Sequence, residues 1–293
     1  MLGVVNLDKP VGPTSHDMVS LVRRLTGIRR VGHAGTLDPL ASGVLPVLVG
    51  QATRFSEELS GGEKRYEAVI RLGATSATDD GEGPVTLTGV AVPVDAEIER
   101  AIAGFVGTYL QRPPAFSARK VGGRAAYRAA RAGEPVEPPP REVTVYGIRV
   151  GSIERGDATA DVALEIHCRA GTYVRSVARG LGERLGCGGY LRALRRTEAS
   201  GLSVEAARTP AALEALASDG RLAEAVQPIA PLLRLPTVDL AAEDAHRFTH
   251  GLGVANADAH GRVAVVAAGR LLGVGQASGG VLRPLKVIPE SSS

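Results

Sequence analysis

The sequence predicts an α+β fold, in which a mixed or antiparallel sheet forms a large domain and a small β-rich domain follows it. Three observations lead to this class. Residues 161–169 alternate between apolar and polar side chains, as a strand buried on one face does. Residues 174–185 continue with the apolar period of a helix, yet no regular succession of strands and helices runs through the chain. From residue 236 onward, short apolar runs alternate with Gly-rich turns.

The first predicted elements are a short buried strand at residues 2–7 and a helix at residues 16–26. The helix has its apolar side chains at helical spacing and leaves two arginines facing outward. Thr14 or Ser15 is expected to cap its N-terminus, and Gly27 is expected to end it.

Two further strands and a second helix are predicted next. Residues 43–50 favour a strand, in which Pro46 implies an edge position or a bulge because proline cannot donate to a ladder. Residues 64–73 alternate and predict another strand. Residues 74–94 are acidic and loop-like, whereas residues 95–105 place their apolar side chains on one helical face.

The C-terminal third indicates a domain boundary. Residues 206–232 are rich in alanine, contain several prolines and are expected to form one or two helices that lead out of the main domain. We therefore expect domains at residues 1–232 and 233–293, the second built from short strands such as 263–269 and 271–277.

The composition is that of an ordinary globular protein, with 44% apolar and 22% charged residues. Cys168 and Cys187 form no CxxC pair, which favours a reducing compartment. The apolar run at the N-terminus is too short for a signal peptide, and no segment approaches the roughly 20 apolar residues of a membrane span. We predict a cytoplasmic protein that does not contact a membrane.

Local charge indicates a polyanionic partner more strongly than the net charge of +3 does. Residues 23–30 carry four basic side chains and no acid, residues 112–131 six and no acid, and residues 169–196 seven against one acid. Each run alone is more typical of a solvated face, but together they predict a surface that follows a phosphate backbone. The middle run lies in a polar segment, about 107–146, that we expect to project as an insertion and to order on its partner.

The segment with the clearest chemical meaning is GHAGTLDPLASG, residues 32–43. It lacks the spacing of a phosphate-binding loop, and His33 and Asp38 are too few to hold a metal. Asp38-Pro39 alone would indicate a turn. However, Pro39 keeps Asp38 out of the helical region, and the surrounding glycines permit close approach by a large ligand. The loop is therefore suited to present one carboxylate.

This motif resembles the signature of the TruB family of pseudouridine synthases, and four other segments resemble that family in the expected order. These segments are LDKPVGPTSHD (7–17), KRYEAVIRLG (64–73), RPPAFSARKVGGRAAYRAARAG (112–133) and EIHCRAGTYVRSVARGLGERLGCGGYLRALRRT (165–197). The C-terminal segment resembles a PUA-type RNA-binding domain. The resemblance implies a stand-alone isomerase that converts the T-loop uridine at position 55 of tRNA to pseudouridine, without a metal or another cofactor.

The resemblance also assigns roles to particular residues. Asp38 is expected to be the nucleophile, Arg175 its ion-pair partner and Tyr66 the ring that stacks on the extruded uracil. From the pattern alone, Arg175 would be a phosphate contact and Tyr66 a core residue. The other positions expected to contact or support the substrate are His33, Tyr173, Leu194, Lys9, Pro10, Lys120 and Arg196.

Two other functions share parts of this pattern. One is a subunit of an RNA-guided pseudouridine synthase, although the basic insertion at 112–133 favours an enzyme that binds the T-loop by itself. The other is a tRNA-binding or tRNA-folding protein whose catalysis is dispensable. For the stand-alone enzyme we expect tRNA as partner, through the T-stem-loop and the acceptor arm, no obligatory protein partner and a monomeric state.

Overall fold

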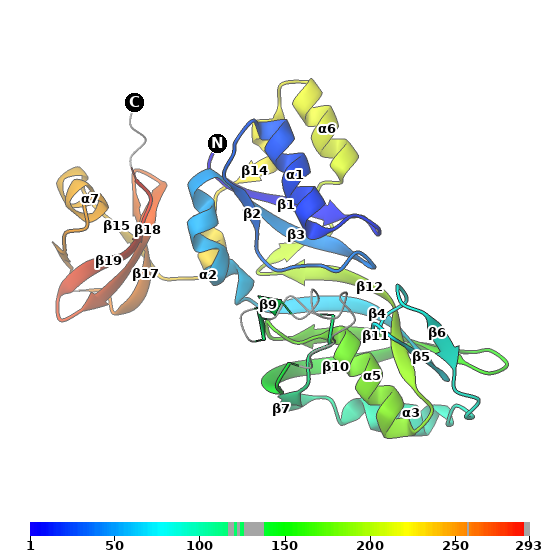
Figure 1. Cartoon of the computed structure of the whole chain (residues 1–293). Coiled ribbons are helices and arrows are strands. Elements are labelled where there is room, and N and C mark those ends of the chain that lie inside the picture. Colours follow the sequence, from blue (N-terminus) through cyan, green and yellow to red (C-terminus); the bar gives the residue numbers. More distant parts are fainter. Residues whose placement is uncertain (117–119, 122–123, 126–137, 257, 290–293) are drawn as a thin grey trace.

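The computed structural model describes residues 1–116, 120–121, 124–125, 138–256 and 258–289 (Figure 1). The helices are α1 (Ser15–Thr26), α2 (Ser56–Ser60), α3 (Asp95–Ala103), α5 (Val174–Leu185), α6 (Pro210–Ser218) and α7 (Ala242–Thr249), with shorter 3₁₀ turns at η1 (Gly50–Phe55), η2 (Leu222–Ala225) and η3 (Ala230–Leu233). The strands of the large domain are β1 (Gly3–Lys9), β2 (Val31–His33), β3 (Ala41–Val49), β4 (Lys64–Leu72), β5 (Ala74–Ser76), β6 (Val85–Leu87), β7 (Gly107–Gln111), β8 (Lys120–Val121), β9 (Arg124–Ala125), β10 (Arg141–Arg155), β11 (Ala160–Cys168), β12 (Gly189–Ala199), β13 (Leu202–Ser203) and β14 (Val226–Gln227). Those of the C-terminal domain are β15 (Thr237–Asp239), β16 (Val254–Ala255), β17 (Gly261–Ala267), β18 (Arg270–Ser278) and β19 (Val281–Val287).

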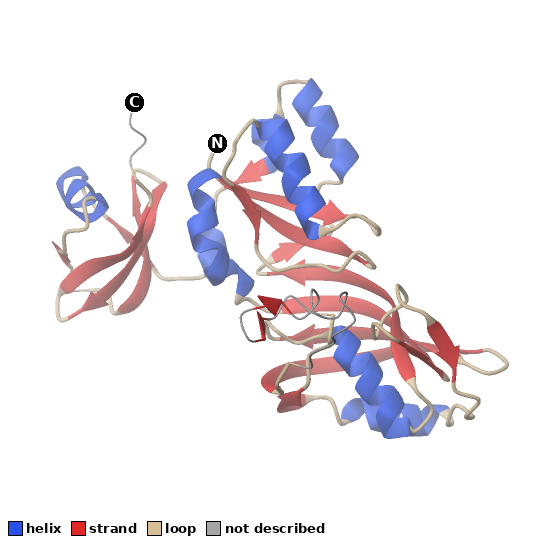
Figure 2. Cartoon of the chain, viewed as in Figure 1, coloured by secondary structure: helices blue, strands red, loops and turns tan. Residues whose placement is uncertain are grey.

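One mixed sheet organises the large domain. Its strand order is β14-β1-β3-β12-β4-β11-β10-β7, with β2 beside β3 and β13 beside β12. All neighbours are antiparallel except β3 and β12, which run parallel where Ala41–Gly43 lies beside Leu194–Arg196. The predicted α+β class with a mixed sheet is confirmed, and Figure 2 shows strands as the dominant element of both domains.

Two pairs of helices pack on this sheet toward its opposite ends, α1 with α6 and α3 with α5 (Figure 1). Both pairs contribute to one apolar core, in which Val19 of α1 and Leu181 of α5 are buried together with Ile70 and Ile166 of the central strands. The middle of the sheet, at β12 and β4, therefore lies between the helix pairs, and the candidate site is found there.

Local sequence explains why α1 begins and ends where it does. Thr14 accepts a hydrogen bond from the Asp17 backbone N–H, and the Asp17 carboxylate accepts one from the Thr14 N–H, which completes a capping box. Gly27 ends the helix with φ +67°, in the left-handed region. The predicted helix and its stop are confirmed, and of the two proposed caps Thr14 is the one observed.

The prediction that Pro46 marks an edge or a bulge is wrong. β3 is an interior strand, and its register with β1 is continuous from Gly43 to Val49. The Pro46 carbonyl accepts from the Ala34 N–H at 2.9 Å, on the side away from β1. The N–H and C=O of one strand residue point to the same side, so an N–H at position 46 would also point away from β1. On that side of β3, β12 pairs with residues 41–43 and β2 with residues 47–49. Position 46 lies between these two pairings, where no strand requires a backbone donor.

Two predicted segments need correction. Residues 74–94 are not a plain loop, because β5 and β6 pair as an antiparallel hairpin within them. The bounds 107–146 for the insertion are too wide, since β7 and the first half of β10 pair with each other at the end of the main sheet. An insertion can only span residues 112–140. Of its basic residues, Arg119, Arg128 and Arg131 lie outside the described residues, as do the side chains of Lys120 and Arg124.

The C-terminal domain is a five-stranded sheet in the order β15-β17-β18-β19-β16, packed against α7. It contacts the large domain through α2, which lies between the two sheets in Figure 1. Phe55 and Leu59 share an apolar cluster with Ala264 and Val274. Glu58 of α2 adds ion pairs to Arg262 at 3.0 Å and Lys286 at 2.9 Å. Among the helices of the described ranges, none is long and apolar enough to span a membrane.

Candidate active site

Asp38 lies in the loop between β2 and β3, and the backbone of this loop is held on both sides of it. The Ser15 hydroxyl at the start of α1 donates to the Leu37 carbonyl at 2.9 Å and accepts from the Leu37 N–H at 2.8 Å. The Ala41 N–H donates to the Asp38 carbonyl at 3.0 Å. Ser15, considered from sequence only as a helix cap, therefore fixes the residue before Asp38.

Arg175 on α5 faces the Asp38 carboxylate. Its Nη2 lies 2.9 Å from Asp38 Oδ2, and its Nη1 lies 3.4 Å from Asp80 Oδ2. The Asp80 side chain is 2% exposed and accepts from the Thr78 hydroxyl at 2.5 Å. Arg175 thus bridges a buried carboxylate and the more exposed Asp38, whose side chain is 37% exposed. Sequence reasoning did not identify Asp80, because it lies 95 positions before Arg175 in an acidic turn.

The environment of Asp38 affects its charge in two directions. Burial raises the pKa of the Asp38 carboxyl, and the nearby Asp80 charge adds to this, whereas Arg175 opposes it by charge and by hydrogen bonding. The balance is a raised pKa. Asp38 therefore titrates nearer to neutral pH than an exposed aspartate, and the ionised form depends on Arg175.

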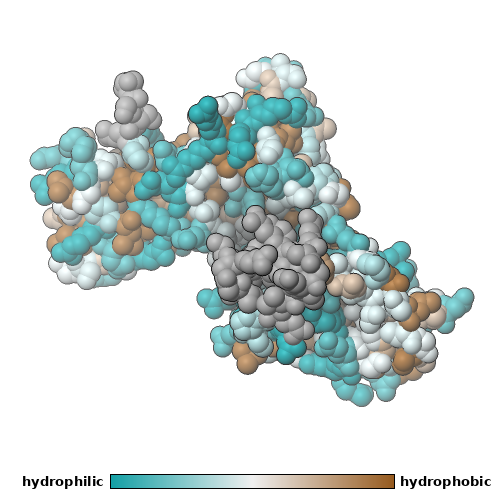
Figure 3. All heavy atoms as spheres, in the orientation of Figure 1, coloured by the Kyte–Doolittle hydropathy of each residue, from teal (hydrophilic) through white to brown (hydrophobic). Residues whose placement is uncertain are grey.

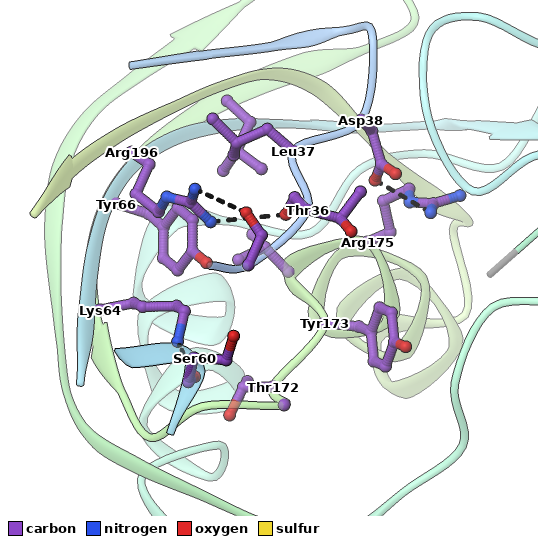
Figure 4. A pocket seen from close by; sticks show the side chains of 14 residues that line it. Thr36, Leu37, Asp38, Ser60, Lys64, Tyr66, Thr172, Tyr173, Arg175 and Arg196 are labelled. Atoms are coloured by element: carbon purple, nitrogen blue, oxygen red, sulfur yellow. Dashed lines mark hydrogen bonds and ion pairs between the residues drawn. The ribbon is translucent and has the colours of Figure 1, made fainter. Parts of the chain in front are cut away.

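Asp38 and Arg175 lie at the wall of a cavity of about 250 Å³ (Figure 4). The volume is below the roughly 300–1,000 Å³ of sites for drug-sized ligands, so the cavity is suited to a small ligand. Its lining residues are Gly35, Thr36, Leu37, Asp38, Ser60, Lys64, Tyr66, Gly171, Thr172, Tyr173, Val174, Arg175, Leu194 and Arg196. Burial raises the pKa of Tyr66 to about 12, so its hydroxyl is neutral at pH 7.

Arg196 braces the loop from inside. Its side chain is among the largest fully buried groups, with 1% exposed. Its Nε donates to the Val44 carbonyl at 2.7 Å, Nη2 to the Gly35 carbonyl at 3.0 Å and Nη1 to the Thr36 carbonyl at 3.4 Å. The guanidinium also opposes the rise in the pKa of the Tyr66 hydroxyl. Arg196 therefore joins β12, the Asp38 loop and the floor of the cavity.

Two buried lysines support the same region. Lys9 Nζ donates to the carbonyls of Pro10 at 2.8 Å and Pro13 at 2.7 Å, and lies 3.5 Å from that of Pro39, next to Asp38. Lys64 lines the cavity and donates to two carbonyls of the turn before it, both at 2.9 Å. Burial lowers the pKa of each lysine to about 8. Lys64 was not identified from the sequence.

The structure brings together most of the predicted site residues. Those that line the cavity are Asp38, Tyr66, Tyr173, Arg175, Leu194 and Arg196. Lys9 lies beneath the loop as expected, whereas His33 and the exposed Pro10 do not line the cavity. Arg196 lines the cavity, but its guanidinium is buried and donates to backbone carbonyls, so a contact between Arg196 and the substrate stays a prediction. The Lys120 side chain lies outside the described residues.

Four of the seven arginines along residues 169–196, where we predicted a phosphate-binding surface, form ion pairs within the protein. Carboxylates distant in sequence neutralise them, in the pairs Arg175–Asp38, Arg179–Asp79, Arg192–Asp161 and Arg195–Asp8. Within residues 23–30, Arg24 pairs with Glu214. A count of charges along the chain overestimated the positive charge because it could not include these partners. In Figure 3, apolar residues form small scattered patches on the described part of the visible face.

No group of three or more His, Cys, Asp or Glu side chains within the described segments could hold a metal ion. The residues at the cavity instead offer one ionisable carboxylate with a fixed cation, a neutral phenol, and a lining in which apolar side chains such as Leu194 alternate with polar ones such as Lys64. This set is suited to act on a small ligand through the carboxylate.

Comparisons with known proteins agree with this arrangement. Two solved structures are similar to this chain over nearly its whole length. One is described as "Structure of H/ACA RNP bound to a substrate RNA containing 2'-deoxyuridine", with a TM-score of 0.74, 26% identity, and coverage of 99% of this chain and 86% of that one. The other is described as "Crystal Structure of a Cbf5-Nop10-Gar1 Complex", with a TM-score of 0.73, 29% identity, and coverage of 98% of this chain and 85% of that one. Curated relatives named "tRNA pseudouridine synthase B" come from Ralstonia pickettii (strain 12J), 42% identical over 98% of this chain and 94% of its own length, and from Thermobifida fusca (strain YX), 46% identical over 99% of each.

Fold and site together define a pseudouridylate synthase, an isomerase. Residues 23–174 match the N-terminal domain model of the TruB family of pseudouridylate synthases, and residues 236–288 match the model "Pseudouridine synthase II TruB, C-terminal". The chain belongs to the TruB family. The family resemblance found in the sequence motifs is confirmed.

Proposed function

We propose that this chain converts the T-loop uridine at position 55 of tRNA to pseudouridine, with Asp38 as the catalytic carboxylate. The observation that carries the proposal is the 2.9 Å pair between Asp38 and Arg175 at the wall of a cavity sized for one base. The names of the curated relatives support tRNA as the substrate.

The reaction requires the base to leave its stack, because its reacting atoms are inaccessible inside a folded RNA. The flipped uracil enters the cavity beside the Tyr66 ring. The bond from N1 to C1′ breaks and a bond from C5 to C1′ forms, while C5 loses a proton and N1 gains one. The product has the same atoms as the substrate, so the reaction is an isomerisation.

Each protein group has a defined part in this proposal. Ionised Asp38 engages the ribose or the base, and Arg175 holds it in the charged form despite its burial. Tyr66 supplies a ring face and a neutral hydroxyl. Tyr173 and Leu194 close the sides of the cavity. These groups complete the reaction without a cofactor.

A T-stem-loop RNA incubated with the purified chain tests the proposal. We expect one pseudouridine at position 55 when the RNA is mapped at nucleotide resolution. The same RNA with cytidine at that position is the control and should stay unmodified. An unmodified uridine after prolonged incubation with excess enzyme would refute the proposed substrate.

The similarity to H/ACA assemblies favours one second candidate, an RNA-guided subunit. An activity assay on an unmodified tRNA transcript, with no other protein or RNA present, distinguishes the stand-alone enzyme from the RNA-guided subunit. The proposed enzyme modifies it, whereas a guided subunit leaves it unmodified until a guide RNA is added. A tRNA-folding role that does not need catalysis would show as tRNA refolding by a variant without activity, and it can coexist with the enzyme.

A further inference from the structure

A second arginine lies behind Arg175 on α5. Arg179 is one helical turn further on and therefore on the same face. Its Nη1 lies 2.6 Å from Asp79 Oδ2, while Arg175 Nη1 reaches the adjacent Asp80. Two successive arginines of the helix thus hold two successive aspartates of one turn. Glu183, at 3.5 Å, is a weaker and more exposed partner of Arg179.

The turn with these aspartates is itself fixed in an unusual conformation. Asp79 has φ +61°, in the left-handed region that non-glycine residues rarely adopt. Its carbonyl accepts from the Leu191 N–H at 3.0 Å, and the Gly81 N–H donates to the Leu191 carbonyl at 3.0 Å. The turn is therefore attached to β12 on one side and to Arg179 on the other, and Asp80 lies between these attachments.

The same helix face also holds the first residues of the insertion. Arg179 Nη2 donates to the Arg112 carbonyl at 2.9 Å, and the Ser176 hydroxyl donates to that carbonyl at 2.8 Å. Arg175 Nη2 donates to the Phe116 carbonyl at 2.9 Å. Arg179 is thus the point where α5, the Asp79–Asp80 turn and the beginning of the insertion meet.

The geometry points to Arg179 as a positioning residue for pseudouridine formation: by holding Asp79 and the Arg112 carbonyl, it keeps the Asp80 carboxylate in place, and Asp80 in turn aims Arg175 at Asp38. This inference rests on the proposed function. Arg175 Nη1 lies 3.4 Å from Asp80 Oδ2 and donates to the Thr78 carbonyl of the same turn at 3.2 Å, so a small shift of the turn would disturb both contacts. Displacements of about 1 Å remote from the reacting atoms can slow an enzyme by roughly 100-fold.

The test compares single-turnover rates at saturating T-stem-loop RNA with the dissociation constant of the same RNA. We expect Arg179→Met to lower the rate constant about 10-fold and to change the dissociation constant less than about twofold. Arg179→Lys keeps a cation near Asp79 and should recover part of the rate. Asp79→Asn should lower the rate similarly, and the double variant should be little slower than either single variant because both act through one contact.

Arg155→Met is the matched control. Arg155 likewise joins an aspartate, Asp95, and two backbone carbonyls, but on β10 at the far end of the sheet. Its loss should leave the rate unchanged. An unchanged rate in Arg179→Met, or a loss confined to RNA affinity, would overturn the inference. Should that variant fail to fold, Asp79→Asn decides in the same way. Inactivity of the wild-type chain would instead refute the proposed function.

Discussion

Asp38 is suited to catalysis because its surroundings disfavour the ionised carboxylate while Arg175 stabilises that form in one orientation. Burial disfavours the carboxylate, and Arg175 restores it in one orientation. We expect Asp38→Asn, which keeps the shape and removes the charge, to abolish pseudouridine formation while tRNA binding stays within about threefold of wild type. Mapping of the product and a filter-binding assay measure the two effects. Turnover by this variant would show that another group starts the reaction.

The raised pKa of Asp38 predicts how the rate depends on pH. The ionised form is the active one, so the single-turnover rate should fall as pH decreases through a pKa above the roughly 3.9 of an exposed aspartate. Arg175 opposes the rise in this pKa. Arg175→Met should therefore slow the reaction at pH 7 and move the acid limb to higher pH. A limb that stays in place would mean that the rate does not report Asp38.

Arg196 should matter for stability more than its partly exposed neighbour Arg195 on β12 does. It donates to the carbonyls of Val44, Gly35 and Thr36, and lysine cannot reach all three of them. We expect Arg196→Lys to lower the free energy of unfolding by about 3 kcal/mol, measured by urea denaturation. Arg195→Met, which removes a partly exposed pair with Asp8, should cost less than about 1 kcal/mol. Equal losses would contradict the bracing role of Arg196.

At this scale the sequence indicated which residues are candidates for the chemistry, but not which residues hold those candidates in place. Asp38, Tyr66 and Arg175 belong to motifs with strong family resemblance, so they could be predicted. Asp80 and Ser15 could not, because each acts on a partner that is distant in the chain, and nothing in the local pattern marks such a partner.

Among the elements, the parallel contact of β3 with β12 fixes the distance between the Asp38 loop and Arg196. Gly43 has φ +101°, and a Cβ there would lie 2.2 Å from the Arg196 carbonyl. We expect Gly43→Ala to lower the free energy of unfolding by about 3 kcal/mol, since the strands must separate. Gly12, with φ +105° and open space around it, is the control for backbone strain alone. Gly12→Ala should cost about 1 kcal/mol in the same urea titration.

The elements predicted from sequence were those with an unbroken period. β4, β11, α1 and α5 each keep one apolar face along their whole length. β10 was missed because register shifts after Val145 and Val150 interrupt its alternation, so its apolar residues change spacing. β12 has two such shifts as well, and its arginines made it resemble a basic surface.

In the whole molecule, charge is arranged differently from what composition suggests. Residues 236–288 carry five basic and four acidic side chains, and two of the basic ones, Arg262 and Lys286, pair with α2 of the large domain. Basic groups of the C-terminal domain thus serve the contact between domains. Burial alone would raise the pKa of Glu58, but hydrogen bonding from Lys286 and the charges of Lys286 and Arg262 outweigh it and lower the pKa.

Folding lowers the pKa of this carboxylate, so the ionised group stabilises the folded state at pH values above its unfolded pKa of about 4.3. This contribution is lost as the pH falls through the lower pKa of the folded state. We therefore expect Glu58→Gln to reduce the free energy of unfolding by about 1–2 kcal/mol at pH 7, and the difference from wild type to shrink below about pH 4. Glu57→Gln is the control, because Glu57 contacts the same Lys286 at 3.3 Å but its side chain is 88% exposed. Its effect should stay below about 0.5 kcal/mol.

Hydrogen exchange should also become faster in β17 and β19 of Glu58→Gln, while β4 and β11 keep their protection. Equal exchange in both variants would show that the shared apolar cluster alone holds the domains together.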